Sequence, residues 1–389
     1  MRSPRDTLIL KPRLQAAEDT LRPTRAEIDL DAVVHNLGVA RERVGSSRVL
    51  AVVKADGYGH GVVPVARRLQ EVGAYGFGVA LAEEALELRA AGIHTEIVVL
   101  NGVHGGAHEE VVAASLTPVV YELPEVRAFA QVAAKRGQPV GVHLKVDTGM
   151  SRLGVPHDVL STFLDSLEGM GSPGAVRIDG CMTHLSSADS DPAVTREQLR
   201  RFDDAVSLVR ARGHRPAVLH AANTAGAFLH PDSRYDLVRL GSALFGYGPP
   251  GTERAGLRPA MRLRTEIISL RRVPAGTRVG YDGTFTAPEE RLIATVPVGY
   301  GDGLIRATSN RAEVLVHGRR CPIVGNVSMD LTGVDVTAIA HVQLGDEVVL
   351  LGRQGGDAID AHELARSAGT IHYEVLTNVS RRVPRFYAG

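Results

Sequence analysis

"VLAVVKADGYGHG", from Val49 to Gly61, joins an apolar run to a lysine and a glycine-rich turn. The β-branched first half predicts a buried strand. This strand ends on Lys54, and a lysine is costly to bury unless its ammonium group is paired or used chemically. The glycine-rich turn allows the backbone to approach a ligand closely. Lys54 is therefore a candidate for chemistry at the end of a buried strand.

Strand-like and helix-like segments alternate after this stretch, and together they make about eight strand–helix units over roughly 200 residues. That number is typical of a closed (β/α)8 barrel. An open doubly wound sheet is the alternative, but no dinucleotide-binding glycine fingerprint follows the first strand. The later strand-like runs are at residues 76–80, 96–102, 117–122, 139–149, 175–185, 217–226 and 235–246.

The pattern changes at "GPPGTERAGLRPAM", residues 248–261, a glycine- and proline-rich piece that is typical of a linker. Beyond it the apolar runs are short and β-branched, and only "DAHELARSAG" has a helical pattern. The sequence therefore predicts three parts. These are a flexible N-terminal extension at residues 1–23, a cofactor-binding barrel at 24–255 and a mostly β C-terminal domain at 256–389.

The composition excludes several kinds of partner. Lysine plus arginine equals aspartate plus glutamate at 44 each, so no charge excess indicates nucleic acid or a membrane surface. No apolar run approaches the length of a membrane span, and the charged N-terminus does not match a secretory signal. Two cysteines, Cys181 and Cys321, do not make a disulfide framework and fit a reducing compartment. We expect a cytoplasmic protein without a metal site.

Polar residues follow the later strands of the expected barrel. Because active sites of such barrels lie at the carboxyl ends of the strands, these side chains should meet at one rim. Any one of them alone could be a capped turn or a hydrogen-bonded histidine. Several cationic and hydrogen-bonding groups at one rim indicate an anionic ligand, and a phosphate fits best beside glycine turns. The residues are Lys145, Asp147, Arg152, His184, His220, Asn223, Thr224, Arg239 and Gly241.

A phosphate site next to Lys54 predicts a Schiff base between this lysine and pyridoxal 5'-phosphate. No acidic residue stands out near the last strand as a partner for the pyridine nitrogen, but Arg239 does. An arginine keeps its proton, so the ring nitrogen would stay unprotonated and the ring would be a weaker electron sink. This favours a limited reaction, such as proton exchange at Cα.

The sequence closely resembles the alanine racemase family, pyridoxal-phosphate enzymes of fold type III, over about residues 24–389. The resemblance implies a (β/α)8 barrel, a β-rich C-terminal domain and a homodimer whose active sites are shared between subunits. It also implies interconversion of L-alanine and D-alanine, which supplies D-alanine for peptidoglycan. The motifs that carry it include "AVVKADGYGHG", "HLKVDTGMSRLG", "MTHLSSAD", "LHAANTAG", "VRLGSALFGYGP", "VPVGYGDG", "GNVSMD" and "YEVLTNVSRRVPR".

The resemblance also implies roles for individual residues. Lys54 matches the Schiff-base lysine and one of two catalytic bases, and Tyr281 matches the second base, which reaches the partner subunit's cofactor. Arg239 matches the residue that faces the pyridine nitrogen. The other positions expected to bind the cofactor, most of them around its phosphate, are Tyr58, His184, Asn223, Thr224, Gly241, Ser242 and Tyr373.

The substrate carboxylate is expected to meet Arg152 and the backbone N–H of Met329, with Asp330 beside it. His184 and His220 match the residues that link Tyr281 to Arg239. Tyr300 matches a tyrosine at the substrate entrance. Lys145 lies where some relatives carry a carbamylated lysine near Arg152.

Three alternatives differ in what the sequence should contain. A non-catalytic pyridoxal-phosphate carrier would lack the second domain and Tyr281. A decarboxylase of the same fold should have an acidic residue in place of Arg239, because its chemistry needs a stronger electron sink. A racemase that also accepts other amino acids, such as serine or lysine, is the third alternative, and the side chains alone do not distinguish it from an alanine-specific racemase.

Overall fold

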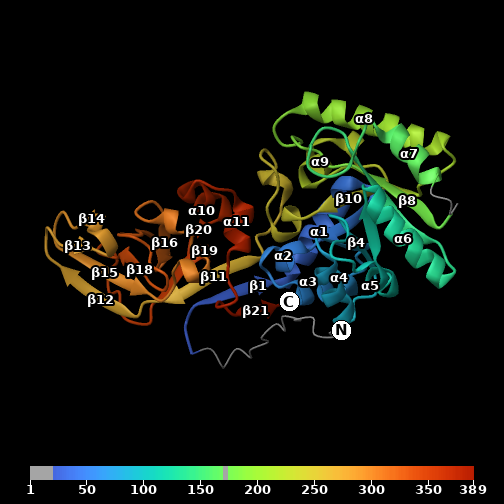
Figure 1. The fold of residues 1–389 in the computed structure, drawn as a ribbon. Coiled ribbons are helices and arrows are strands. Elements are labelled where there is room, and N and C mark those ends of the chain that lie inside the picture. The colour runs from blue at the N-terminus through green and yellow to red at the C-terminus, as the bar shows by residue number, and fades with distance from the viewer. Residues whose placement is uncertain (1–20, 170–173) are drawn as a thin grey trace. The chain divides into compact units, whose positions relative to one another are not determined.

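The computed structural model describes residues 21–169 and 174–389, which form two compact units (Figure 1). The barrel unit comprises Ala32–Gly57 and Val62–Arg258. The β-rich unit comprises residues 21–31, Tyr58–Gly61 and Pro259–Gly389. Residues 1–20 of the expected N-terminal extension lie outside the described residues.

The barrel unit contains eight parallel strands in the order β10-β2-β3-β4-β5-β6-β8-β9, with a short β7 (Val155–Pro156) beside β6. Hydrogen bonds from Asp236 N to Leu219 O (3.1 Å) and from Arg239 N to Ala222 O (3.0 Å) link the two ends of this order. The ring is nearly closed, which confirms the predicted barrel. The strands are β2 (Arg48–Val52), β3 (Gly76–Val79), β4 (Glu96–Val99), β5 (Thr117–Val120), β6 (Val140–Asp147), β8 (Val176–Met182), β9 (Val218–His220) and β10 (Leu237–Leu240).

Helices surround the barrel strands (Figure 1). Their ends follow local chemistry: the Asp191 side chain accepts from two N–H groups at the start of α8, and α6 ends at Gly137 in a left-handed conformation. None of the helices in the described part of the chain is long and apolar enough to cross a membrane. The helices are α1 (Leu30–Val44), α2 (Lys54–Tyr58), α3 (Val62–Glu71), α4 (Ala82–Ala90), α5 (His108–Ala113), α6 (Leu123–Arg136), α7 (Leu160–Glu168), α8 (Pro192–Ala211) and α9 (Thr224–Leu229).

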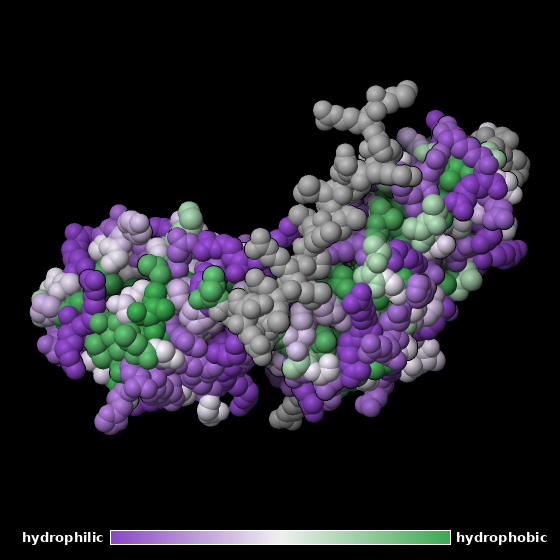
Figure 2. Space-filling model, turned by 90° about the horizontal axis from the view of Figure 1, so that it is seen from below, coloured by the Kyte–Doolittle hydropathy of each residue, from purple (hydrophilic) through white to green (hydrophobic). Residues whose placement is uncertain are grey.

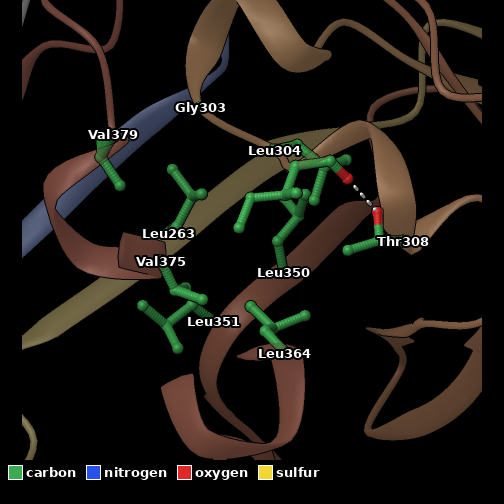
Figure 3. Close-up of a pocket in the computed structure, with 10 residues that line it drawn as sticks. Leu263, Gly303, Leu304, Thr308, Leu350, Leu351, Leu364, Val375 and Val379 are labelled. Carbon is green, nitrogen blue, oxygen red and sulfur yellow. Dashed lines mark hydrogen bonds between the residues drawn. The ribbon is translucent and has the colours of Figure 1, made fainter. Parts of the chain in front are cut away.

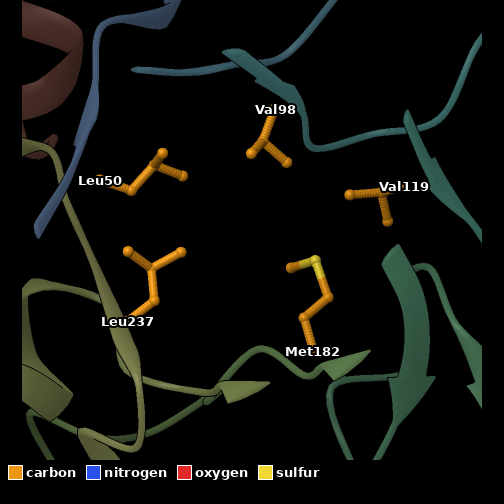
Figure 4. Close-up of a cluster of buried hydrophobic side chains, with 5 residues drawn as sticks. All are labelled: Leu50, Val98, Val119, Met182 and Leu237. Atoms are coloured by element: carbon orange, nitrogen blue, oxygen red, sulfur yellow. The ribbon is translucent and has the colours of Figure 1, made fainter. Parts of the chain in front are cut away.

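The barrel interior is filled by side chains. Leu50, Val98, Val119, Met182 and Leu237 come from five different strands and point toward one another (Figure 4). Each is fully buried, and burial of such a side chain contributes about 1.5–3 kcal/mol. Because this core leaves no channel through the barrel, a ligand has to bind at the strand ends.

The β-rich unit confirms the prediction of a mostly β C-terminal part. Its largest sheet has the order β17-β16-β19-β11-β1-β21, with β20 beside β19. The sequence predicted one helix here, whereas the structure has two, α10 (Ala361–Ala368) and the short α11 (His372–Thr377). The strands are β1 (Arg25–Asp29), β11 (Met261–Glu266), β12 (Ser269–Val273), β13 (Arg278–Val279), β14 (Phe285–Thr286), β15 (Arg291–Val296), β16 (Glu313–Val316), β17 (Arg319–Pro322), β18 (Thr332–Asp335), β19 (Glu347–Gln354), β20 (Asp357–Ile359) and β21 (Arg385–Ala388).

Strand β1 lies in this sheet, although its residues fall within the barrel range 24–255 expected from the sequence. It pairs antiparallel with β11 and parallel with β21. Ala26 and Ile28 are buried, while Glu27 on the other face accepts hydrogen bonds from Arg262 (2.9 Å) and Arg264 (2.6 Å) of β11. Alternating burial and these cross-strand ion pairs explain why β1 joins β11.

The core of the β-rich unit contains a cavity of about 20 Å³ (Figure 3). Its lining is apolar and includes Leu263, Leu304, Leu350 and Leu364. No titratable side chain lines this cavity, so it has the character of a packing gap. The chemistry of this chain has to be sought elsewhere.

Candidate active site

The carboxyl ends of the barrel strands carry the residues predicted for the cofactor. Lys54 follows β2, Lys145 is on β6, and Arg152 is in the loop after β6. His184 follows β8, and His220 ends β9. The remaining ones follow β9 or lie on or after β10, and they are Asn223, Thr224, Arg239, Gly241 and Ser242.

Arg239 is the centre of a buried hydrogen-bond network, and its side chain is only 3% exposed. Nη1 donates to His220 Nδ1 (3.1 Å) and to the His220 carbonyl (2.9 Å). Nη2 donates to the carbonyls of Thr183 and Ala221 (2.8 and 2.9 Å) and to His184 Nδ1 (3.1 Å). Its Nε–H has no acceptor among the residues that the structure describes. Burial lowers the pKa of Arg239 to about 9, so the guanidinium stays charged at neutral pH.

The N–H groups of Arg239 determine which ring nitrogen carries the proton in each of the two histidines. Because a guanidinium only donates, Nδ1 of His184 and of His220 must accept, and each neutral ring then carries its proton on Nε2. Burial, followed by neighbouring positive charge, lowers the pKa of His184 well below 6.5. Burial also lowers the pKa of His220, with His143 the next cause. The His184 Nε2–H has no acceptor in the described part of the chain and is available to another group.

His143 extends this network and was not singled out from the sequence. Its Nδ1 lies 3.0 Å from His220 Nε2 and accepts a hydrogen bond from the Nε2–H of His220. Burial lowers the pKa of His143 to about 4, which keeps the ring neutral. The signal was present, because His143 and Lys145 are two residues apart on β6 and therefore share a face of the strand.

Positive charge gathers at this rim. Burial lowers the pKa of Lys54, with Arg152 the next cause. Burial, then Arg239, Arg152 and Lys54, lower the pKa of Lys145 to about 8. Within residues 21–169 and 174–389, none of these four cations forms an ion pair with a carboxylate. Such a rim attracts an anion and suits a ligand that carries both a phosphate and a carboxylate.

The backbone after Lys54 makes a left-handed turn. The φ and ψ angles are 52° and 54° at Ala55, 52° and 47° at Asp56, and 63° and 41° at Gly57. A left-handed conformation costs roughly 1–2 kcal/mol for each residue other than glycine. The sequence indicated a glycine turn, but the strained positions Ala55 and Asp56 are not glycines. Strain of this kind is often held at functional sites.

Backbone groups gather on the phosphate side of the rim. The Asn223 side chain accepts from Gly226 N (2.9 Å) and so caps α9, whose first residue is Thr224. Gly241 N donates to the Thr224 hydroxyl (3.3 Å), and Ser242 begins a 3-10 turn that ends at Phe245. The structure thus brings Thr224, Gly241 and Ser242 into one neighbourhood. In the β-rich unit, the rings of Tyr58 and Tyr373 lie 6.0 Å apart.

Tyr281 belongs to the β-rich unit and is 72% exposed. It begins the 3-10 turn Tyr281–Gly283, in which Asp282 has a φ of 61°. The Asn326 side chain donates to the Tyr281 carbonyl (3.1 Å) and to the Asp282 carboxylate (3.2 Å). Asn326, which sequence reasoning did not identify, therefore holds the turn that presents Tyr281.

Of the residues expected at the substrate side, Arg152 is in the barrel unit, whereas Tyr300, Met329 and Asp330 lie in the β-rich unit. Gly301 N donates to Met329 O (2.9 Å), which places Met329 beside the turn of Tyr300. Asp330 accepts from Arg382 (2.7 Å). The Met329 N–H has no acceptor among the described residues, so it is free to meet a carboxylate.

Arg239→Lys should destabilise the protein by about 3–5 kcal/mol, because the shorter amine cannot reach both histidines and the three carbonyl groups. Urea unfolding of the purified variant measures this loss. Arg177→Lys is the matched control, since Arg177 is exposed and pairs with Asp179 at the surface. Equal stability of the two variants would contradict the assigned network.

Comparison with known proteins gives a consistent result. The family model "Alanine racemase, N-terminal domain" matches residues 28–249, and "Alanine racemase, C-terminal domain" matches residues 260–387. An alanine racemase of Sorangium cellulosum is 47% identical and covers 94% of this chain and 99% of its own length. An alanine racemase of Symbiobacterium thermophilum is 45% identical and covers 95% of this chain and 98% of its own length.

Solved structures agree with these sequences. The alanine racemase of D-cycloserine-producing Streptomyces lavendulae superposes with a TM-score of 0.90 at 36% identity and covers 95% of this chain and 98% of its own. That of Bacillus anthracis, solved with bound L-Ala-P, has a TM-score of 0.88 at 34% identity, with 95% and 96% covered.

The barrel with a lysine at its rim, followed by a β-rich unit, defines this protein as a barrel enzyme of the amino-acid racemase class. Within that class, the chain belongs to the alanine racemase family.

Proposed function

We propose that the chain interconverts L-alanine and D-alanine with pyridoxal 5'-phosphate, using Lys54 and Tyr281 as bases on opposite faces of Cα. The observation that carries the proposal is the cationic rim around Lys54, whose four cations form no ion pair among the described residues. A substrate carboxylate and a cofactor phosphate are the anions that such a rim would neutralise. When bound, pyridoxal phosphate supplies an electron sink that makes the Cα–H of an attached amino acid acidic.

The residues of this chain fit that cofactor. Lys54 supplies an amine whose pKa is lowered by burial, which favours its reactive neutral form. The Nε–H of Arg239, which has no acceptor among the described residues, would donate to the pyridine nitrogen and keep it unprotonated. Thr224 and the N–H groups of Gly241 and Ser242 would hold the phosphate, with Tyr58 and Tyr373 as further donors.

Racemisation requires that a proton leave one face of Cα and another arrive on the opposite face. Two fixed bases accomplish this without moving. Lys54 would serve one face and Tyr281 the other. Arg152 and the Met329 N–H would bind the substrate carboxylate and keep Cα between the bases. Lys145 adds positive charge beside Arg152.

We propose further that Tyr281 acts in the active site of a partner subunit of a homodimer. Its 72% exposure supports this, since a catalytic phenol needs a drier environment than bulk water. Other exposed apolar side chains of the β-rich unit include Met329, Leu331 and Ile371, and Figure 2 shows hydrophobic patches on this unit. The free Nε2–H of His184 would donate to the incoming Tyr281 oxygen and favour its phenolate form.

The physiological role we propose is supply of D-alanine for peptidoglycan in the cytoplasm. Both cysteines are buried and free, which fits a reducing compartment. A broader amino-acid racemase is the alternative. The purified holoenzyme should convert L-alanine to D-alanine faster than it converts serine or lysine. Absence of D-alanine with cofactor supplied would overturn the proposal, and equal rates would favour the broader racemase.

Complementation tests the shared site. Lys54→Ala and Tyr281→Phe chains, each inactive alone, should regain activity when mixed, because a mixed dimer has one site with both lesions and one with neither. Random pairing leaves about a quarter of all sites intact. If heterodimers form but stay as inactive as the parents, Tyr281 does not act across a dimer.

A further inference from the structure

We propose that Glu84 is a positioning residue for Lys54, and the inference rests on the proposed function in taking Lys54 as the cofactor-binding base. Glu84 Oε1 accepts a hydrogen bond from Ala55 N at 2.6 Å. That N–H belongs to the peptide group that joins Lys54 to Ala55. The carboxylate therefore fixes the plane of this peptide, and with it the direction in which the Lys54 side chain leaves the backbone.

The carboxylate is itself firmly held. Glu84 is the third residue of α4, and its Oε2 accepts from Ala80 N (2.8 Å) and Leu81 N (3.2 Å) at the start of that helix. An acidic side chain at this position satisfies N–H groups that the helix leaves free. One oxygen thus caps α4, while the other is committed to Ala55. Any movement of the Lys54 peptide would break a bond to a group that cannot follow.

The two strands involved are neighbours. β2 pairs with β3 through Val52 and Gly78, and Val53 N donates to Gly78 O (2.9 Å). Lys54 comes at the end of β2, and Ala80 directly follows β3. Glu84 therefore joins the ends of two paired strands at the rim, where a small rotation of the backbone would displace a long side chain most.

The backbone needs such a tether because Ala55 and Asp56 are strained. Two other hydrogen bonds restrain the left-handed turn, from Gly57 N to Val53 O (2.9 Å) and from Val62 N to Asp56 Oδ1 (2.8 Å). The first bond stays within the turn, whereas the second ties the turn to Val62, the first residue of α3. The Glu84 bond ties the same turn to α4, which follows the neighbouring strand β3.

Charge gives Glu84 a second effect on the same lysine. The charged groups that face Lys54 are Arg152, Lys145 and Glu84. Burial and Arg152 lower the pKa of Lys54, whereas Glu84 raises it. Removal of the carboxylate should therefore make more of Lys54 neutral and reactive, while it leaves the amine poorly directed. These two consequences have opposite signs, which a general loss of structure would not produce.

The test compares Glu84→Gln with Glu83→Gln, its exposed neighbour on the same turn of α4. Alanine turnover by the Glu84→Gln holoenzyme should fall about 10- to 100-fold. The full-length chain freed of cofactor gives the second readout. At pH 7, an amine-directed anhydride should modify Lys54 about 3- to 10-fold faster than in wild type, relative to exposed Lys135. Glu83→Gln should match wild type in both.

The Glu84→Asp variant separates the effect of the carboxylate's position from the effect of its charge. It is also the variant to use if Glu84→Gln folds poorly. It keeps the negative charge but is one methylene shorter, so it cannot cap α4 and reach Ala55 together. Turnover should fall while the Lys54 modification rate stays near that of wild type. Turnover of Glu84→Gln within twofold of Glu83→Gln, or full activity of Glu84→Asp, would overturn the inference. Lack of alanine racemisation by the wild-type enzyme would instead count against the proposed function.

Discussion

Lys54→Ala should abolish racemisation in both directions, with a loss of about 10³-fold or more, because it removes both the covalent anchor of the cofactor and one base. The chain has only four lysines, Lys11, Lys54, Lys135 and Lys145, so the modified residue is easy to identify. Borohydride reduction of the wild-type holoenzyme followed by peptide mapping should place the cofactor on Lys54.

Lys135→Ala is the matched control for this result. Lys135 is exposed and pairs with Glu109 at the surface, far along the chain from the strand ends. Its loss should change neither turnover nor labelling. A borohydride-stable cofactor adduct that persists in Lys54→Ala would show that another lysine carries the cofactor.

Tyr281→Phe should lower turnover about 10²- to 10⁴-fold, the contribution typical of a positioned acid or base. The cofactor should stay bound, because the proposal assigns Tyr281 to proton transfer and not to the phosphate. The loss should appear in both directions, since each direction uses Tyr281 once, either to remove a proton or to return one.

Isotope effects sharpen this prediction. With deuterium at Cα, the variant should show unequal effects for L- and D-alanine, because Lys54 still serves one face unaided. Progress curves from both enantiomers measure this difference. Wild-type turnover, or equal isotope effects in the two directions, would contradict the two-base proposal.

Much of the barrel was predictable because one rule connects sequence to position. Parallel strands alternate with helices, and polar residues after the strands meet at one rim. This rule alone predicted that Lys54, His220 and Arg239 lie at the same rim of the barrel. Their assigned roles stay predictions, whereas the hydrogen bonds between Arg239 and the two histidines are seen in the structure.

The residues that sequence reasoning missed act through a neighbour. Glu84 belongs to a helix and contributes by accepting from the backbone N–H of Ala55 in the turn after β2, for which no side-chain pattern exists. Asn326 likewise binds the carbonyl of Tyr281, 45 residues away. His143 had a detectable sequence signal, because it is a polar residue on the same face of a predicted strand as Lys145. The alternation of β1 marks a half-buried strand but does not say which later strands it pairs with.

The pairing of β1 has a consequence for synthesis of the chain on the ribosome. β1 (Arg25–Asp29) emerges long before its partners, because it pairs with β11, which begins at Met261, and with β21, which begins at Arg385. At about 5–20 residues per second, β1 waits roughly 10–50 s for β11. Throughout that time it is an unpaired strand with an apolar face, the kind of segment that nascent-chain chaperones shield. The sheet of the β-rich unit is completed only after β21 has also been synthesised.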